Sequence, residues 1–140
     1  MKTLWVIVLA VFGLTACGED TPVDLNAPTT DEKDTLTLAF LNNMPMKSGS
    51  AIDCKTTQIG KRYYAGCAVI SIGNRGNTYI FLYNKDKDPV KRFYALNGSA
   101  MSKYDTYFKS EKLLGNYKDA FGLPMEKDID LGAVHKAFDK

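Results

Sequence analysis

Two neighbouring stretches of the chain, residues 52–59 and 62–72, have the pattern of extended segments: Ile52, Cys54 and Thr56 alternate with Asp53, Lys55 and Thr57 along the first, and the second is mostly apolar. The two residues between these stretches are Gly60 and Lys61. Glycine accepts the positive φ that the first position of a type II′ turn requires. The pattern therefore predicts a β-hairpin with a two-residue turn.

The register of this hairpin places Cys54 opposite Cys67. Pairs alternate outward from the hydrogen-bonded pair beside the turn, and the two cysteines fall in a non-hydrogen-bonded pair, where a disulfide can form. A bridge here contributes about 3 kcal/mol in the chain-entropy model. A redox-active pair would have Cys-x-x-Cys spacing, which these cysteines lack. The face that carries the cysteines, with Ile52, Ala65 and Val69, is expected to point into the core.

Two further strands are predicted over residues 78–83 and 90–96, each after a polar, turn-rich stretch. They complete a four-stranded antiparallel meander. A helix is predicted before the sheet, over residues 31–43, because acidic residues begin it and apolar residues follow. The Thr-Leu-Thr-Leu sequence inside this segment also alternates as a strand does.

Short helices are predicted after the sheet. Their signals are a capping box at Ser102-x-x-Asp105, a helical repeat over residues 113–121 and an apolar stripe over residues 131–138. The sequence thus predicts an α+β fold, in which the four-stranded meander packs with an N-terminal helix and short C-terminal helices and carries one disulfide.

The composition does not change this predicted fold, but it excludes several classes of protein and of binding site. The chain has 140 residues, 24% charged and 45% hydrophobic, which excludes collagen, coiled coil and wholesale disorder. Three cysteines and one histidine are too few for a zinc cluster. No glycine-rich phosphate loop follows a strand, since the glycines of Gly73-x-x-Gly76 bound a turn. The sequence therefore predicts no metal and no cofactor.

The first 16 residues have the pattern of an export signal. Lys2 precedes an apolar run of eleven residues, which is too short to span a membrane because a spanning helix needs about 20. The run ends in Leu14-Thr15-Ala16-Cys17, which resembles the lipobox of bacterial lipoproteins. The resemblance implies that residues 1–16 are removed and that Cys17 carries a diacylglycerol and an acyl chain such as palmitate, enough for stable membrane attachment. The alternative is an ordinary secretory signal.

The residue after Cys17 is Gly18. In lipoproteins of Gram-negative bacteria an aspartate at this position commonly retains the protein in the inner membrane, so the resemblance implies the outer membrane, with the domain facing the periplasm. Residues 17–34 are expected to form a flexible acidic tether, because residues 18–34 contain six acidic residues and one lysine.

Residues 35–140 are expected to form a single periplasmic domain. They contain 16 basic and 10 acidic residues, but no basic run is longer than two residues. Binding of nucleic acid is therefore not indicated.

The segment Asn84-x-Asp86-x-Asp88 resembles the start of a calcium-binding loop. Its sixth position is Pro89 and its twelfth is Ala95, where an EF-hand has glycine and glutamate, so a polar connection between strands is predicted instead.

Catalytic chemistry has few candidates. His135 has no nucleophile motif near it, and one of Asp128 and Asp130 is expected to cap the last helix rather than to form an acid–base pair. The sequence therefore predicts no catalytic residue.

Tyrosine and arginine gather in the predicted sheet. Tyr79 and Tyr83 share one face of a strand and Ile80 and Leu82 share the other, so both faces are apolar. The rings can form the core, or they can form a recognition surface, where tyrosine and arginine are favoured. The residues of such a partner-binding surface would be Arg62, Tyr63, Tyr64, Tyr79, Tyr83, Arg92 and Tyr94.

These observations predict a membrane-attached protein that binds an envelope protein without catalysing a reaction, as an inhibitor, an immunity-type protein or an exclusion protein. The alternative is a structural accessory lipoprotein of a secretion or outer-membrane assembly. A third class is a hydrolase that uses Asp128, Asp130 or His135.

Overall fold

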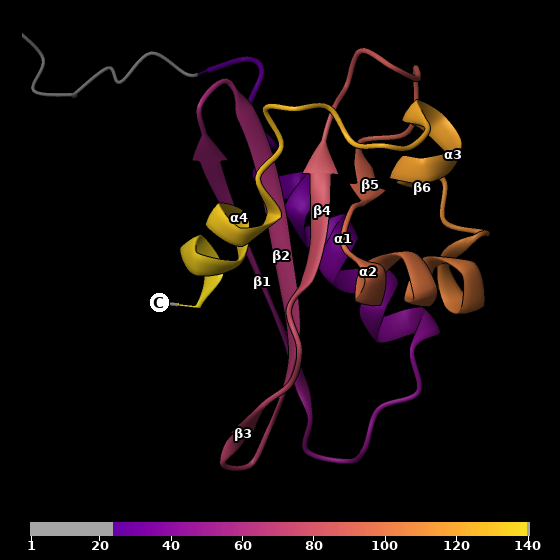
Figure 1. Ribbon diagram of the computed structural model, residues 1–140. Coiled ribbons are helices and arrows are strands. Elements are labelled where there is room, and N and C mark those ends of the chain that lie inside the picture. The colour runs from indigo at the N-terminus through magenta and orange to yellow at the C-terminus, as the bar shows by residue number, and fades with distance from the viewer. Residues whose placement is uncertain (1–23, 140) are drawn as a thin grey trace, which may run out of the picture.

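The computed structural model describes residues 24–139. The export signal, the lipobox and Cys17 therefore lie outside the described residues. Figure 1 shows one sheet with helices on both of its faces. In chain order the elements are α1 (Thr30–Asn43), β1 (Ala51–Ile59), β2 (Arg62–Ser71), β3 (Asn74–Arg75), β4 (Tyr79–Tyr83), β5 (Phe93–Ala95), α2 (Gly98–Lys103), the π-helical segment η1 (Tyr104–Phe108), β6 (Leu114–Asn116), α3 (Tyr117–Phe121) and α4 (Leu131–Phe138).

The sheet has the strand order β1-β2-β4-β5-β6, and the short strand β3 pairs with the last two residues of β2. Neighbouring strands are antiparallel except β5 and β6, which are parallel. The predicted four-stranded antiparallel meander is therefore confirmed as β1, β2, β4 and β5. Beyond it, β6 adds a parallel edge strand that the sequence analysis did not predict.

The first hairpin has the predicted register. Ile59 pairs with Arg62 beside the turn, and Cys54 pairs with Cys67. A type II′ turn has a positive φ at its first central residue and a negative φ at its second. Gly60 has φ +61°, and Lys61 is not among the residues with a positive φ, so the turn has the predicted type. The disulfide between the two cysteines is present, with their Cα atoms 4.1 Å apart.

Helix α1 forms where it was predicted, and the alternative reading as a strand is wrong. Thr29 caps the helix in a capping box with Glu32. Leu36, Ala39 and Phe40, at helical spacing, are buried against the sheet. The helix begins at Thr30, so the folded domain starts before the expected boundary at residue 35.

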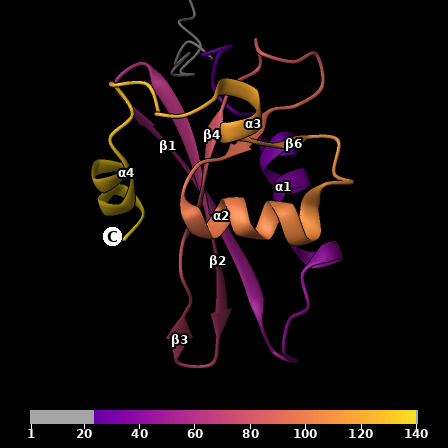
Figure 2. The same cartoon turned by 45° about the vertical axis from the view of Figure 1, so that its right-hand side comes forward.

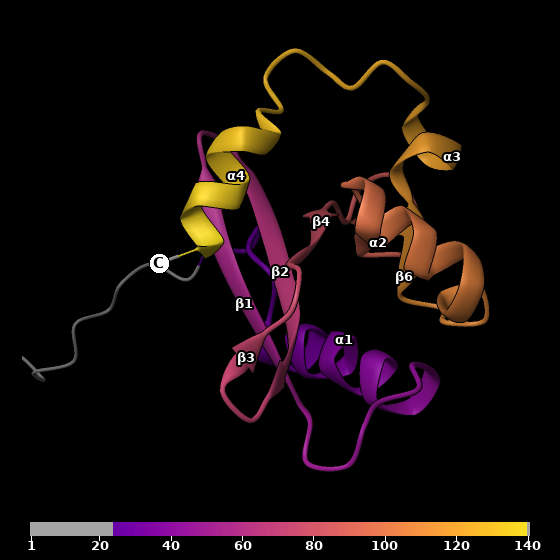
Figure 3. The same ribbon diagram turned by 60° about the horizontal axis from the view of Figure 1, so that its bottom comes forward.

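The sheet divides the core into two clusters. On one face, α1, α2 and η1 cover the side that carries Cys67 and Phe81. On the other face, α3 and α4 cover the side that carries Tyr64 and Ile80. Figure 3 shows α4 and α1 on opposite sides of β1 and β2, and Figure 2 shows α2 continuing into η1 as one helical ribbon. Both faces of the central strands are therefore buried.

The predicted helix start at Ser102 is wrong. The helix begins at Gly98, and its cap is Asn97, whose side chain accepts hydrogen bonds from the backbone N–H groups of Ala100 and Ile80 and donates one to the Thr78 carbonyl. Asn97 is buried and joins α2 to β4, so a tertiary contact selects this cap over Ser102, which lies inside α2.

The predicted helix over residues 113–121 is wrong in its first half. Leu114–Asn116 forms β6, whose backbone pairs with β5, and only Tyr117–Phe121 is helical, with Asn116 as its cap. The apolar spacing fits both structures. The free edge of β5 offers hydrogen bonds that a helix at this place would leave unsatisfied.

The predicted strand over residues 90–96 is shortened to β5. The Asp88 side chain accepts hydrogen bonds from the backbone N–H groups of Val90 and Lys91, which holds these residues in a turn. Extended pairing therefore starts only at Phe93.

Candidate functional site

The disulfide is the first predicted site that the structure describes. Cys67 has no exposed surface, and Cys54 is half-buried beside the core cluster under α1. The bridge therefore lies on the inward face of the hairpin, as predicted. A buried bridge of this kind is a structural staple, because solvent-borne thiols cannot reach Cys67 directly.

The predicted tyrosine and arginine surface is not one surface. Tyr64 and Tyr94 lie in the cluster under α3 and α4, and Tyr83 lies in the cluster under α1. All three are buried, because helices cover both faces of the sheet. These three rings belong to the core, while Tyr63 and Tyr79 are half-buried.

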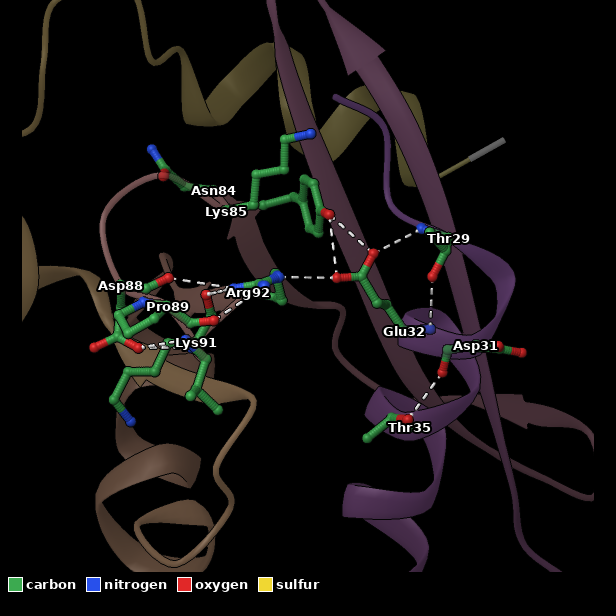
Figure 4. A network of polar contacts seen from close by, with 12 residues as sticks. Thr29, Asp31, Glu32, Thr35, Asn84, Lys85, Asp88, Pro89, Lys91 and Arg92 are labelled. Atoms are coloured by element: carbon green, nitrogen blue, oxygen red, sulfur yellow. Dashed lines mark hydrogen bonds and ion pairs between the residues drawn. The ribbon is translucent and has the colours of Figure 1, made fainter. Parts of the chain in front are cut away.

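Glu32 joins three parts of the domain in a polar network (Figure 4). Its carboxylate accepts a hydrogen bond of 2.9 Å from the Tyr83 hydroxyl and pairs with the Arg92 Nε at 3.1 Å. The same carboxylate accepts a hydrogen bond from the Thr29 backbone N–H. Glu32 therefore ties the start of α1 to β4 and to the residue before β5.

Burial raises the pKa of the Tyr83 hydroxyl, and the hydrogen bond to Glu32 raises it further. Arg92 is also held by the backbone, since its guanidinium donates to the carbonyls of Asp88, Pro89 and Lys91. The Arg92 guanidinium is thus bound within the domain. Its positive charge is paired with the Glu32 carboxylate and is not available to bind another protein.

Arg62 has a similar internal role. Its guanidinium pairs with Asp128 at 2.6 Å and also contacts Glu126, so it fastens the segment between α3 and α4 to β2. The hydrogen bond from Arg62 lowers the pKa of the Asp128 carboxyl. Asp128 is therefore held as a carboxylate by an ion pair.

The candidate catalytic residues have separate structural contacts. The Asp130 side chain accepts a hydrogen bond from the Ala133 N–H and caps α4, as predicted. His135 lines a polar hollow of about 550 Å³ together with Asn97 and Ser99, and neither Asp128 nor Asp130 lines it. Asp128 therefore pairs with Arg62 and Asp130 caps α4, while His135 lies beside the hollow.

The Asn84–Asp88 segment forms the predicted polar connection. The Asn84 side chain accepts hydrogen bonds from the N–H groups of Asp86 and Lys87, and Asp88 caps the next turn. Across residues 24–139 no cluster of three or more histidine, cysteine or acidic side chains could hold a metal ion.

Residues 24–29, expected to be part of a solvated tether, lie against the domain instead. The Tyr63 hydroxyl donates a hydrogen bond to Asp24, and the Lys85 ammonium donates one to the Leu25 carbonyl. The hydrogen bond from Tyr63 lowers the pKa of the Asp24 carboxyl. The attachment of this segment was not visible in the sequence, because its contacts come from β2 and from the connection after β4.

The outer edge of β1 is a feature that the sequence analysis missed. Hydrogen-bonded and non-hydrogen-bonded pairs alternate from Ile59 and Arg62, so every second residue of β1 directs its N–H and C=O away from β2. No other strand of the described chain pairs with this edge. The residues whose backbone N–H and C=O groups point away from β2 are Ile52, Cys54, Thr56 and Gln58.

This edge can accept an added strand. It is nine residues long, contains no proline and carries one lysine, Lys55, whereas edge strands that avoid pairing are usually short, kinked or strongly charged. Thr56 and Gln58 are exposed. An extended segment of another protein could therefore form backbone hydrogen bonds along β1.

Comparisons with protein-family models, with curated proteins and with solved structures found no match. The helices that the structure describes include none that is long and apolar enough to cross a membrane.

Proposed function

We propose that this protein is a lipid-anchored, non-enzymatic binding protein of the bacterial envelope. Its anchor is Cys17, its place is the outer membrane facing the periplasm, and its partner is another envelope protein. It acts there as an inhibitor, an immunity-type protein or an exclusion protein. The observation that carries the proposal is the Cys54–Cys67 disulfide inside the core, because stable structural disulfides form outside the cytoplasm.

The free edge of β1 supports a binding role. Main-chain hydrogen bonds along an added strand give affinity, and the side chains on either side of the edge give selectivity. By contrast, of the candidate acid–base residues, Asp128 is engaged by Arg62 and Asp130 caps α4. Binding therefore agrees better with the geometry than hydrolysis by Asp128, Asp130 or His135.

The anchor is tested by fractionation of cells that produce the protein or its Cys17→Ala variant. The proposal expects the native chain in the outer-membrane fraction, with acyl chains on Cys17 by mass spectrometry. Cys17→Ala should move to the soluble periplasmic fraction. A native protein with an unmodified Cys17 would overturn the anchor.

The partner is tested by crosslinking in intact cells, followed by purification under denaturing conditions. Capture of one enzyme or effector supports the inhibitory role. A stoichiometric set of envelope-assembly subunits would replace it with the accessory-subunit role. Hydrolysis of an envelope polymer by the purified native protein, lost in the triple Asp128→Ala, Asp130→Ala, His135→Ala variant, would refute a non-enzymatic function.

A further inference from the structure

One end of the domain holds the first described residues of the chain. The Asp24 carboxylate accepts a hydrogen bond from Tyr63, which lies beside the β1–β2 turn. The Leu25 carbonyl accepts one from Lys85, which follows β4. Figure 1 shows that this end also carries the β4–β5 connection and the segment between α3 and α4. We call it the proximal end and define it by residues 24–29, 60–61, 84–92 and 122–129.

The opposite end of the domain is the turn between β2 and β3, which Figure 1 shows far from the proximal end. Strand β2 runs between the two ends over ten residues, a length of about 33 Å at the usual rise of a strand. Ile72 lies in this turn and is 96% exposed.

The chain between Cys17 and the proximal end is short. Seven residue steps separate Cys17 from Asp24, and seven residues reach at most about 25 Å even when fully extended. A tether that was free as far as residue 34 would reach about 60 Å and would let the domain turn over completely. The contacts of Asp24 and Leu25 remove that freedom.

We propose that the proximal end lies against the membrane and that its partner is the phospholipid head-group surface. The inference rests on the proposed lipidation of Cys17. Because the permitted span is shorter than β2, an anchored chain cannot turn the domain over so that the Ile72 turn rests on the bilayer beneath the proximal end while Asp24 keeps its contact with Tyr63.

The side chains of the proximal end suit a head-group surface. Three of its segments each carry an exposed apolar residue, Leu25 (79% exposed), Val90 (49%) and Leu123 (63%). Such residues enter the boundary between head groups and acyl chains.

The charges of the proximal end suit anionic lipids. Lys61, Lys87 and Lys127 are exposed there. Five acidic groups lie beside them: Glu126 and Asp128 are paired with Arg62, Asp24 accepts a hydrogen bond from Tyr63, Asp88 caps backbone N–H groups, and Asp86 is exposed. Exposed lysines beside apolar residues favour anionic phospholipids.

The test measures which end of the anchored protein lies near the bilayer. The full-length lipidated protein is reconstituted into vesicles of phosphatidylethanolamine and phosphatidylglycerol that contain a lipid with a nitroxide on its head group. A fluorophore is attached to Leu123→Cys at the proximal end or, as the matched control, to Ile72→Cys at the opposite turn. Both residues are exposed and apolar, so neither label has to replace a buried side chain.

The nitroxide lipid is expected to quench the label at position 123 several-fold more than the label at position 72. Val90→Cys provides a second proximal site and should behave like position 123. Equal quenching at both ends, or stronger quenching at position 72, in protein that floats with the vesicles would overturn the orientation alone. Failure to float with the vesicles would overturn the anchor and the orientation together.

Discussion

Phe138 of α4 lies directly over Gly66 of β2, so closely that a Cβ atom on Gly66 would stand 2.7 Å from the phenylalanine ring. No side chain can occupy this space without displacing the ring. The absence of a side chain on Gly66 therefore lets α4 lie flat against the sheet and close the second core cluster.

Gly66→Ala is expected to lower the free energy of unfolding by about 1–3 kcal/mol, because the new methyl group must push Phe138 out of the core. The measurement is urea unfolding followed by circular dichroism. Gly98→Ala is the matched control, since a Cβ at Gly98 meets nothing within 4 Å, and it should change stability by less than about 1 kcal/mol. Equal losses for the two variants would contradict the close packing of Phe138.

Replacing both Cys54 and Cys67 with serine is expected to cost about 3 kcal/mol and to lower Tm clearly, because the bridge restricts the unfolded chain. Calorimetry of the variant and the native protein measures the effect. The native protein should react with a thiol reagent at these cysteines only after denaturation and reduction. Rapid reaction of both thiols in the exported protein would refute the bridge.

Several tyrosines of the native protein should ionise at a higher pH than free tyrosine does. Burial raises the pKa of Tyr64, Tyr94 and Tyr104, and burial with the Glu32 hydrogen bond raises that of Tyr83. The folded state disfavours these phenolates relative to the neutral phenols. The contribution of the neutral phenols to the free energy of unfolding is therefore fully present below about pH 10, and it is lost as the pH rises through the raised pKa values of the folded state. Tyrosinate absorbance should therefore rise at higher pH in the native protein than in urea.

Tyr83→Phe should remove one phenol from the late part of this titration. The same variant loses the hydrogen bond to Glu32 and should be destabilised by about 1–2 kcal/mol, because the bond joins a buried hydroxyl to a carboxylate. An unchanged late amplitude in Tyr83→Phe would show that the pKa of the Tyr83 hydroxyl is not raised in the native protein.

Thr56→Pro should abolish partner capture while leaving the domain folded. The N–H of Thr56 points away from β2, so proline removes a donor from the free edge without breaking the β1–β2 ladder. Thr56→Val keeps the N–H and serves as the control. Capture in crosslinked cells is expected to fall at least tenfold for the proline variant only, and undiminished capture with a native melting curve would exclude the edge as the binding site.

The parts of the fold that the sequence predicted are those with local causes. The turn at Gly60 and Lys61 fixed the pairing of Cys54 with Cys67 through geometry alone. The start of α1 followed from Thr29 and Glu32, only three residues apart.

The parts that could not be predicted depend on distant residues. Leu114–Asn116 became a strand because β5 offered a free edge, and Asn97 displaced Ser102 as a cap because it also bonds to β4. Tyr64 and Tyr94 became core because helices cover both faces of the sheet, which alternation along a strand cannot reveal. The attachment of residues 24–29 likewise depends on Tyr63 and Lys85.

The place of Phe138 over Gly66 has a consequence for biosynthesis. The residues of α4 follow every strand in the chain, so the hairpin face that receives Phe138 stays open to water until residue 138 has been synthesised. Without α4, Tyr64 and Ile80 lose the cover that Val134 and Phe138 give them in the folded domain, and exposed apolar surface of this kind is prone to aggregation. A chain that ends before α4 therefore leaves this face of the sheet uncovered, and chaperones and proteases recognise such surfaces.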